Sequence, residues 1–370
     1  MILTRLELIL RARISKKPDF SKMTLTETAY WARRIIKYGS ITLVSLIVAI
    51  FAWRGIYFVY RLAFPKPPPP PEVKFKTLPP LVYDSRVQPA LTYKLETEKG
   101  EDLSTLPTQA NVYFMPTPQS SLSSLDAAVQ VAQALGYSPA GTPLSDVIYR
   151  FSHRDTPSVL DINIVNKTAS ISYNLVEDPS LLALRPRSEA EAINVALSFL
   201  TRGGLLAQDL AQGRQEVEKM ASGPEALVRV GSISEANFVR VNFLRRNYDG
   251  LPVIASKIDR GNVWLLVSGE TSGPKQVIAG EYHYFPVAEE QRSTYPIKTA
   301  QAAWEELQAG KGFIISPPSS GTSATIRRVS LAYYDSGKPQ QFLQPVVVFD
   351  GDGGFRAVVP AVVAEYYQSQ

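Results

Sequence analysis

Residues 38–60 read YGSITLVSLIVAIFAWRGIYFVY, and this stretch determines the environment of every other segment. The run from Ile41 to Trp53 carries no charge, and a second apolar run follows Arg54. At a rise of about 1.5 Å per residue, a helix over 38–60 crosses the roughly 30 Å hydrocarbon core of a bilayer. The stretch therefore predicts a transmembrane helix whose partner is the lipid bilayer.

Three residues of this span are candidates for contact with another membrane helix. A charge at the bilayer centre costs about 3 kcal/mol on insertion scales, but Arg54 lies near one end, where its side chain can reach the interface. The alternative is that Arg54 pairs with a partner helix. The small residues Gly39 and Ser40 would allow two helices to approach closely.

Basic residues are concentrated before the span. Residues 1–37 hold nine Lys and Arg against three Asp and Glu, and basic flanks remain in the cytoplasm. A signal-peptide cleavage site of small residues is not recognisable, so we expect an uncleaved single-pass anchor in a bacterial cell membrane, with residues 1–37 inside and the C-terminal part outside. The apolar residues of 2–14 recur at helical spacing, which predicts an amphipathic helix on the inner leaflet or on a cytoplasmic partner.

The charge of the outer part excludes one class of partner. The whole chain has a formal net charge of +5. Once the six net positive charges of residues 1–37 and the three of Arg54, Arg61 and Lys66 are set aside, residues 67–370 carry −4. A segment with a mildly negative net charge lacks the basic surface that binding of nucleic acid requires. The chain also has no cysteine, so disulfides, thiolate nucleophiles and cysteine-bound zinc are excluded.

The outer part divides into three segments by composition. Residues 61–80 include five consecutive prolines, 67–71, which favour a polyproline II spacer above the membrane. We expect two α+β domains after it, over 81–187 and 188–370.

A weak repeat of a strand, a connection and a helix runs through both predicted domains. Strands are expected at 110–115, 169–175 and 279–285, and helices at 123–136, 188–204 and 296–312. Further strands are expected at 146–153 and 159–165 in a first meander, at 226–230, 238–246, 253–259 and 263–268 in a second, and at 342–349 and 355–363 in a hairpin. The pattern predicts an α+β fold in which antiparallel sheets are each packed with short helices.

No constellation of residues points to catalysis. The two histidines, His153 and His283, have no metal-ligand spacing around them and are interpreted as structural. The chain has no GxSxG motif. The carboxylate pairs 289–290 and 305–306 are interpreted as solvated, so we expect no enzymatic activity and no cofactor.

One motif allows two interpretations, a hairpin turn or a cation-binding loop. The alternating aspartates Asp350 and Asp352, in the sequence DGDGG, resemble the start of a calcium loop. The twelfth position of such a loop is Ala361 instead of a bidentate glutamate. We therefore interpret 350–354 as a hairpin turn, with a cation loop as the alternative.

Two segments of the sequence resemble known protein families. The segment 239–255, VRVNFLRRNYDGLPVIA, resembles the DGLPV strand pair of PepSY-type and YycH/YycI-type extracytoplasmic domains. Residues from 295 to the C-terminus are similar to the helix-then-sheet module of the same group. YycI-type proteins are accessory regulators of a cell-wall sensor kinase, and the resemblance implies a non-catalytic domain. This chain differs in its longer inner segment and its proline run.

These observations together predict a membrane-anchored extracytoplasmic protein that binds an envelope ligand or regulates a membrane partner such as a sensor kinase. Two alternatives stay open at this point. One is an envelope enzyme that uses carboxylates on glycan, and the other is a structural component of an envelope or secretion assembly.

Overall fold

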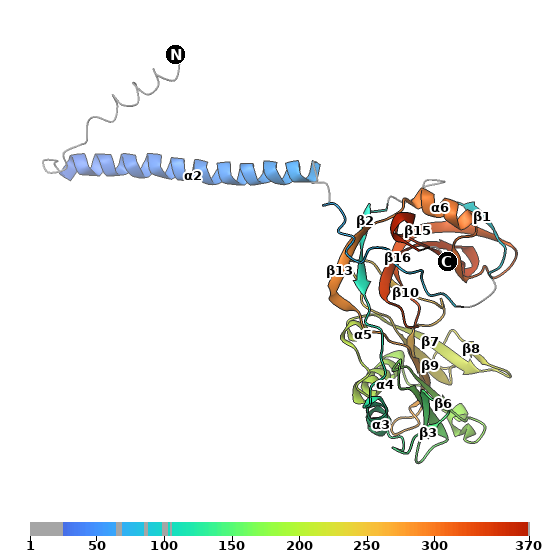
Figure 1. The fold of residues 1–370 in the computed structure, drawn as a ribbon. Helices are drawn as coiled ribbons and strands as arrows, with labels where there is room; N and C mark the ends of the chain where they lie inside the picture. Colours follow the sequence, from blue (N-terminus) through green and yellow to red (C-terminus); the bar gives the residue numbers. More distant parts are fainter. Residues whose placement is uncertain (1–24, 64–68, 85–87, 98–102, 104–105, 369–370) are drawn as a thin grey trace. The chain divides into compact units, whose positions relative to one another are not determined.

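The computed structural model describes residues 25–63, 69–84, 88–97, 103 and 106–368 (Figure 1). The chain divides into two compact units, Met1–Pro70 and Pro71–Gln370. The amphipathic segment predicted within residues 2–14 lies outside the described residues.

The first unit contains the long helix α2, Leu25–Ala63. By length and composition, its part from Thr28 to Arg61 is able to cross a membrane. The helix begins well before the predicted span because residues 25–37 contain no proline or glycine that would stop it. Aromatic side chains stand near both ends of the apolar run, and Arg61 lies over the ring of Tyr57 at 5.2 Å. This distribution is typical of residues at the two membrane interfaces.

The second unit contains two sheets, and the first is antiparallel throughout. Across the sheet the order is β3 (Thr142–Pro143), β4 (Ile148–Ser152), β5 (Ser158–Asn163), β6 (Ala169–Tyr173), β12 (Val277–Tyr282), β11 (Val263–Ser268), β9 (Phe238–Phe243), β7 (Gln215–Ser222) and β8 (Leu227–Arg229). The first predicted meander is confirmed, because β4, β5 and β6 are neighbours in sequence order. We call this the nine-stranded sheet.

The second sheet has eight strands and is mainly antiparallel. The main strand order is β1 (Thr92–Leu95), β15 (Ser323–Asp335), β16 (Phe342–Gly351), β17 (Arg356–Pro360) and β14 (Phe313–Ser316). In addition, β10 (Val253–Ala255) pairs with β15, and β2 (Gln109–Phe114) pairs with both β16 and β13 (Ala288–Pro296). Only the pairings of β1 and β10 with β15, among the described strands, are parallel. The predicted C-terminal hairpin is confirmed as β16 and β17, joined through the short helix η3, Asp352–Gly354.

The three predicted helices form, and each buries its alanine-rich face against a sheet. Helices α3 (Ser124–Ala134) and α4 (Glu189–Arg202) pack on the nine-stranded sheet, whereas α6 (Ala300–Gln308) packs on the eight-stranded sheet. Side chains cap two of them: Ser188 accepts a hydrogen bond from Glu191 N, and Thr299 accepts one from Ala302 N. The predicted α+β class is thereby confirmed.

The second predicted meander is wrong in two places. Strand β10 does not follow β9 in its sheet but lies parallel to β15 in the other. Strand β8, predicted at 226–230 beside the strand 238–246, pairs with β7 instead of β9. Strands β1, β3, β7, β13, β14 and β15 were not among the predicted strands. The sequences of β7 and β13, QEVEKMAS and AEEQRSTYP, are rich in charged and polar residues. The third repeat unit therefore contains β13 between its predicted strand and α6.

Domain boundaries drawn from composition do not coincide with the sheets. Both sheets use strands from before and after residue 187. Residues 72–80 pack within the second unit: Val73 N donates to Thr294 O at 3.1 Å, and Leu78 is fully buried. This part of the predicted spacer 61–80 therefore belongs to the folded second unit. The remaining short helices are η2 (Pro179–Ala183), α5 (Gln208–Ala211) and η4 (Ala364–Tyr366).

Candidate functional site

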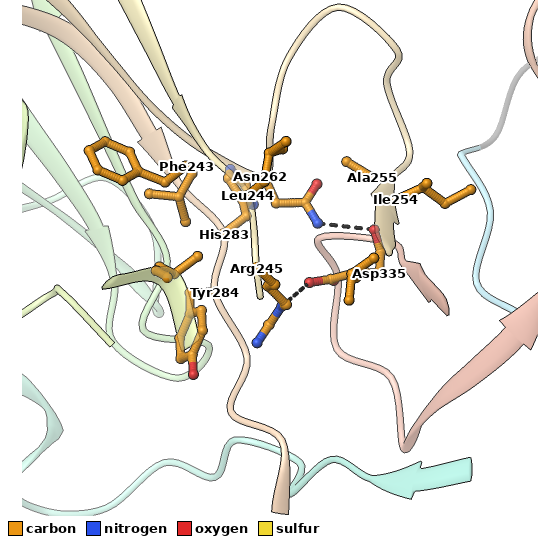
Figure 2. Close-up of a pocket in the computed structure, with 12 residues that line it drawn as sticks. Phe243, Leu244, Arg245, Ile254, Ala255, Asn262, His283, Tyr284 and Asp335 are labelled. Carbon is orange, nitrogen blue, oxygen red and sulfur yellow. Dashed lines mark hydrogen bonds and ion pairs between the residues drawn. The ribbon is translucent and has the colours of Figure 1, made fainter. Parts of the chain in front are cut away.

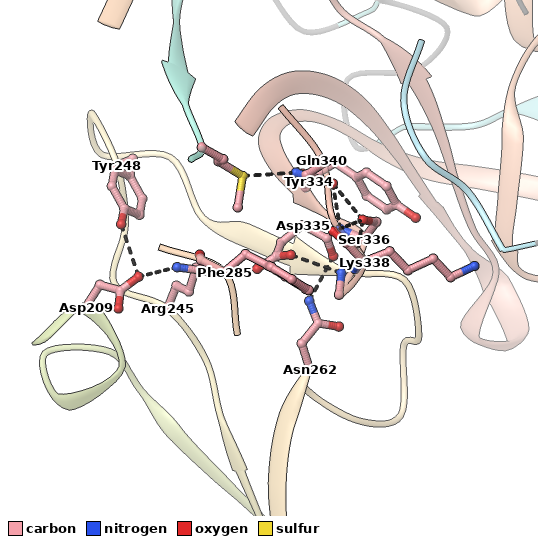
Figure 3. A network of polar contacts seen from close by, with 12 residues as sticks. Asp209, Arg245, Tyr248, Asn262, Phe285, Tyr334, Asp335, Ser336, Lys338 and Gln340 are labelled. Atoms are coloured by element: carbon pink, nitrogen blue, oxygen red, sulfur yellow. Dashed lines mark hydrogen bonds and ion pairs between the residues drawn. The ribbon is translucent and has the colours of Figure 1, made fainter. Parts of the chain in front are cut away.

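A buried arginine joins the two sheets of the second unit (Figure 3). Arg245, just after β9, donates from Nε to Asp335 Oδ2 at 2.7 Å and from Nη1 to Asp209 Oδ2 at 2.5 Å. Its Nη2 donates to the carbonyl of Phe285 at 2.6 Å. The side chains of Arg245, Asp209 and Asp335 are only 4, 6 and 5% exposed. We call these three residues the Arg245 cluster.

Electrostatics keep Arg245 itself in its charged form. Burial by itself would lower the pKa of Arg245, but the charges of Asp335 and Asp209 outweigh burial and raise it. The ring of Tyr284 lies 4.4 Å from the guanidinium, and Tyr248 donates its hydroxyl to Asp209 at 3.1 Å. Because Asp335 ends β15 while Arg245 follows β9, the cluster fixes one sheet against the other.

A small cavity of about 20 Å³ adjoins the cluster (Figure 2). Arg245, Asn262 and His283 are among the residues that line it, and Asn262 Nδ2 donates to the carbonyl of Asp335 at 3.0 Å. This volume is close to that of one water probe, so the cavity is too small for an organic ligand. His283 therefore has a place in the packing between the sheets.

The DGLPV motif is the turn that carries the chain from one sheet to the other. Asp249 and Gly250 have positive φ values of 51° and 77°, and Tyr248 and Leu251 exchange backbone hydrogen bonds, as a type I′ turn requires. The next carbonyl, of Pro252, accepts a hydrogen bond from Tyr333 N at 2.8 Å. The motif therefore docks β10 on β15.

A shared carboxylate stabilises this turn. Asp249 Oδ2 accepts hydrogen bonds from Tyr113 Oη at 2.7 Å, Asn111 Nδ2 at 2.9 Å and Tyr333 Oη at 3.0 Å. Burial acts to raise the pKa of Asp249, but these hydrogen bonds outweigh it and lower the pKa. Burial together with the Asp249 carboxylate raises the pKa of Tyr113 to about 12.

A groove of about 1080 Å³ lies between the two sheets, next to the Arg245 cluster. One wall is the face of β15, β16 and β17 that points away from α6, and it includes Arg328, Ser330 and Asp350. The opposite side is formed by the start of β7, the residues after β9, β10 and the loop 257–261. We call it the inter-sheet groove.

The inter-sheet groove is polar and has an excess of positive charge. Seven Lys and Arg and four Asp and Glu line it. Arg328 and Arg356 share a single carboxylate, donating to Asp350 Oδ2 at 2.8 Å and to Asp350 Oδ1 at 2.6 Å. Lys257 is exposed and forms no hydrogen bond or ion pair with the described residues. The groove therefore offers cationic side chains to a ligand.

The residues predicted as helix-contact sites lie in α2. Ser40 donates its hydroxyl to the carbonyl of Lys37 at 3.0 Å, and a Cβ added at Gly39 would meet no atom within 4 Å. Arg54 stands on the exposed surface of this helix. Whether Gly39, Ser40 and Arg54 contact a partner helix stays a prediction.

The predicted cation-loop residues bind arginines. Asp350 lies in β16 and Asp352 in η3, where Arg327 donates from Nε to Asp352 Oδ1 at 3.0 Å and from Nη2 to Asp352 Oδ2 at 2.6 Å. This contact lowers the pKa of Asp352. Within the described residues, no three His, Asp or Glu side chains gather as a metal site would require. The cation loop stays an untested alternative.

The other candidate residues take part in local contacts. His153 accepts a hydrogen bond from Asp155 N at 3.1 Å, and burial lowers the pKa of this histidine. Of the carboxylate pairs, Glu289 pairs with Arg246, and Glu306 with Lys298 at 2.8 Å.

Sequence reasoning missed the Arg245 cluster. Asp209 and Asp335 are 36 and 90 residues from Arg245 along the chain. No spacing links residues so far apart, and each stands in a segment that also contains exposed charges. The one available signal was the pair Arg245–Arg246 directly after the buried strand FVRVNF.

Comparisons with known proteins find only distant structural similarity. No family model and no curated protein matches the chain. The crystal structure of an uncharacterized protein from Eubacterium rectale ATCC 33656 is 13% identical, with a TM-score of 0.35 over 71% of this chain and 86% of that one. The Bacillus megaterium YpeB C-terminal domain is 13% identical, with a TM-score of 0.31 over 68% of this chain and 97% of that one. The PepSY/YycI-type resemblance stays a prediction.

Proposed function

We propose that the chain is a membrane-anchored, non-catalytic binding protein of the bacterial cell envelope, which holds its ligand in the inter-sheet groove. The observation that carries this proposal is the groove itself. Its volume of about 1080 Å³ lies at the upper end of the range for ligand sites. Its walls come from two sheets that the buried Arg245 cluster holds together, so the binding surface is formed before the ligand arrives.

The charges in the groove support binding rather than catalysis. Each lining carboxylate has a basic neighbour: Glu216 pairs with Arg214, Glu218 with Arg240, Asp259 with Arg260, and Asp350 with Arg328 and Arg356. Because each of these carboxylates already contacts a basic side chain, we propose that they position arginines rather than transfer protons.

Helix α2 supplies the anchor in this proposal. It is long and apolar enough to span a bilayer, a property that it shares with signal sequences. We propose an anchor with the N-terminus in the cytoplasm, because the flank before the apolar run is basic. Occupancy of the groove would then be reported to a membrane partner, for which a sensor kinase is one example.

Photo-cross-linking in cells tests the function. A photo-reactive residue replaces Lys257 at the groove rim, Tyr57 in the span, or Lys311 as a control, and the captured species are identified by mass spectrometry. Lys257 and Lys311 are both exposed, and only Lys257 lines the groove. We expect one specific envelope ligand or membrane partner at position 257 and none at 311. Equal capture at both positions, or conversion of the captured species by the purified chain, would contradict the proposal.

The anchor has its own test. Mass spectrometry of the intact chain from the membrane fraction gives its N-terminus. Retention of residues 1–37 after alkaline extraction is expected for an anchor, whereas a chain that begins after α2 would indicate a cleaved signal sequence.

A further inference from the structure

A second pocket lies on the nine-stranded sheet, apart from the inter-sheet groove. Its volume is about 410 Å³, within the range of sites for small molecules. Four segments line it: the end of α3, the turn between β4 and β5, the second half of α4, and the turn between β11 and β12. No residue given for this pocket also lines the groove. We call it the His153 pocket.

The inner wall of the His153 pocket is apolar. Leu135, Tyr137, Phe199 and Val277 line it, and all four are buried members of the core between the helices and the nine-stranded sheet. The pocket therefore extends from the surface down to the hydrophobic core. A ligand that enters it can bury an apolar group against these side chains, which favours binding in proportion to the area removed from water.

Two arginines at the His153 pocket are available to a ligand. Arg154 and Arg202 line it, both are exposed, and neither forms a hydrogen bond or an ion pair with the described residues. The guanidinium of Arg202 lies 5.8 Å from the centre of the Phe199 ring, which is part of the apolar wall. Charge and apolar surface therefore stand side by side in this pocket.

His153 supplies a further donor. Its Nδ1 accepts a hydrogen bond from Asp155 N at 3.1 Å, so the proton of the neutral ring is on Nε2. Burial and the charge of Arg154 lower the pKa of His153, and they outweigh the opposing charge of Asp155, so the neutral ring is favoured. Nε2 lies beside Gly136, where an added Cβ would be 3.1 Å away, and it donates to no described residue.

The charge of the lining indicates the class of ligand. Arg154 and Arg202 contribute two positive charges and Asp155 one negative charge, so the lining carries 2 − 1 = +1 with His153 neutral. A ligand with a single negative charge balances this, whereas a phosphate dianion exceeds it and is repelled by Asp155. Guanidinium groups bind a carboxylate through charge-assisted hydrogen bonds.

We propose that the His153 pocket is a second ligand site, which binds a small organic acid with one carboxylate. The carboxylate accepts hydrogen bonds from Arg154, Arg202 and the Nε2–H of His153. The apolar part of the acid packs on Phe199 and Val277. This site goes beyond the function proposed above and does not depend on it, because the two cavities share no lining residue.

Ligand-observed NMR tests the preference for a carboxylate. The probes are pentanoate, hexanoate, benzoate and phenylacetate, each compared with its uncharged primary amide, and hexyl phosphate as a dianion. They are titrated against the full chain in detergent micelles, and empty micelles correct for partition into detergent. We expect at least one acid to bind about tenfold or more tightly than its amide, and more tightly than hexyl phosphate.

Three arginine variants locate the site. Arg154→Gln and Arg202→Gln should each weaken the best acid about fivefold, because each removes a donor to the carboxylate. Arg187→Gln is the matched control and should change the affinity less than twofold. Arg187 lies just before α4 with its side chain 65% exposed, and it does not line this pocket. Thermal unfolding of the three variants confirms that they are folded.

NMR of the histidine rings reports on the same site directly. The chain has only two histidines, so ¹⁵N-histidine labelling gives two ring spectra. His153→Phe assigns them and keeps an aromatic ring next to Tyr137, whose ring centre is 5.3 Å from that of His153. Binding of the best acid should shift the Nε2 signal of His153 and leave His283 unchanged.

Several results would overturn the inference. These are the absence of any acid that binds more tightly than its amide, tighter binding of hexyl phosphate, equal effects of the three arginine variants, and an unchanged His153 signal. Tighter binding of acetyl-tetraalanine with a free carboxylate than of any small acid would identify a peptide terminus as the ligand instead. Cross-linking at position 257 reports on the groove alone, so either proposal can fail while the other stands.

Discussion

Replacing Arg245 by methionine removes the cation between two buried carboxylates. The three hydrogen bonds that Arg245 donates, to Asp335, Asp209 and the Phe285 carbonyl, are lost together. Methionine is apolar, unbranched and flexible, so it can fill much of the space that the arginine side chain occupied. The main consequence is that Asp209 and Asp335 remain in a site where they are 6 and 5% exposed, with no compensating charge.

The size of the effect follows from this burial. Removal of one partner from a buried ion pair costs about 3–5 kcal/mol, because the remaining charge is desolvated and unpaired. We expect Arg245→Met to lower the free energy of unfolding by about 4 kcal/mol. The neighbouring Arg246 provides the control, since it pairs with Glu289 at 31 and 45% exposure. An exposed pair contributes about 0–1 kcal/mol, so Arg246→Met should cost less than about 1 kcal/mol.

Urea unfolding of the full chain in detergent micelles measures both values. Tryptophan fluorescence follows Trp264 in β11 and Trp304 in α6, so both sheets have a reporter. If the two variants differ by less than about 1 kcal/mol, the Arg245 cluster does not hold the sheets together as we infer. Adding Asp209→Asn and Asp335→Asn to Arg245→Met removes the unpaired charges and should restore much of the loss. A triple variant no more stable than Arg245→Met would show that packing, not charge, causes the loss.

Three further predictions concern other parts of the chain. A Cβ at Gly213 would lie 1.8 Å from the Leu244 carbonyl oxygen, so Gly213→Ala should lower the free energy of unfolding in urea by about 2 kcal/mol or more. At Gly231 an added Cβ meets no atom within 4 Å, so Gly231→Ala should lower it by less than about 1 kcal/mol. Equal losses for the two variants would contradict the close approach at Gly213. The folded-state pKa of Asp249 is lowered, so its stabilisation is complete above the unfolded pKa of about 4 and is lost as the pH falls through the folded value. Stability curves between pH 2 and 6 should therefore be flatter for Asp249→Asn than for the unaltered chain, and parallel curves would refute this. Replacing Arg54 by leucine should leave the amount of chain in the membrane fraction unchanged, because the side chain can reach the interface; a fall on immunoblots would indicate that Arg54 pairs with a partner helix.

Local sequence patterns determined the elements of this protein that depend on neighbouring residues. The apolar run 41–53 predicts a membrane-spanning helix, and the periodic alanines with their capping residues predict α3, α4 and α6. The turn at Asp249 and Gly250 was also predictable, since a type I′ turn needs two residues that tolerate positive φ. Each of these signals lies within a few residues of the structure that it predicts.

Tertiary structure alone decided which strands pair and where the site lies. The three residues of β10 follow a hairpin-type turn after β9, yet they leave that sheet and join β15, which is 80 residues further along the chain. Short apolar strands can pair with many partners, and the choice depends on which faces the whole chain can bury together. The same choice brings Asp209, Arg245 and Asp335 into contact. The inter-sheet groove exists only because of these long-range pairings, so no local pattern could predict it.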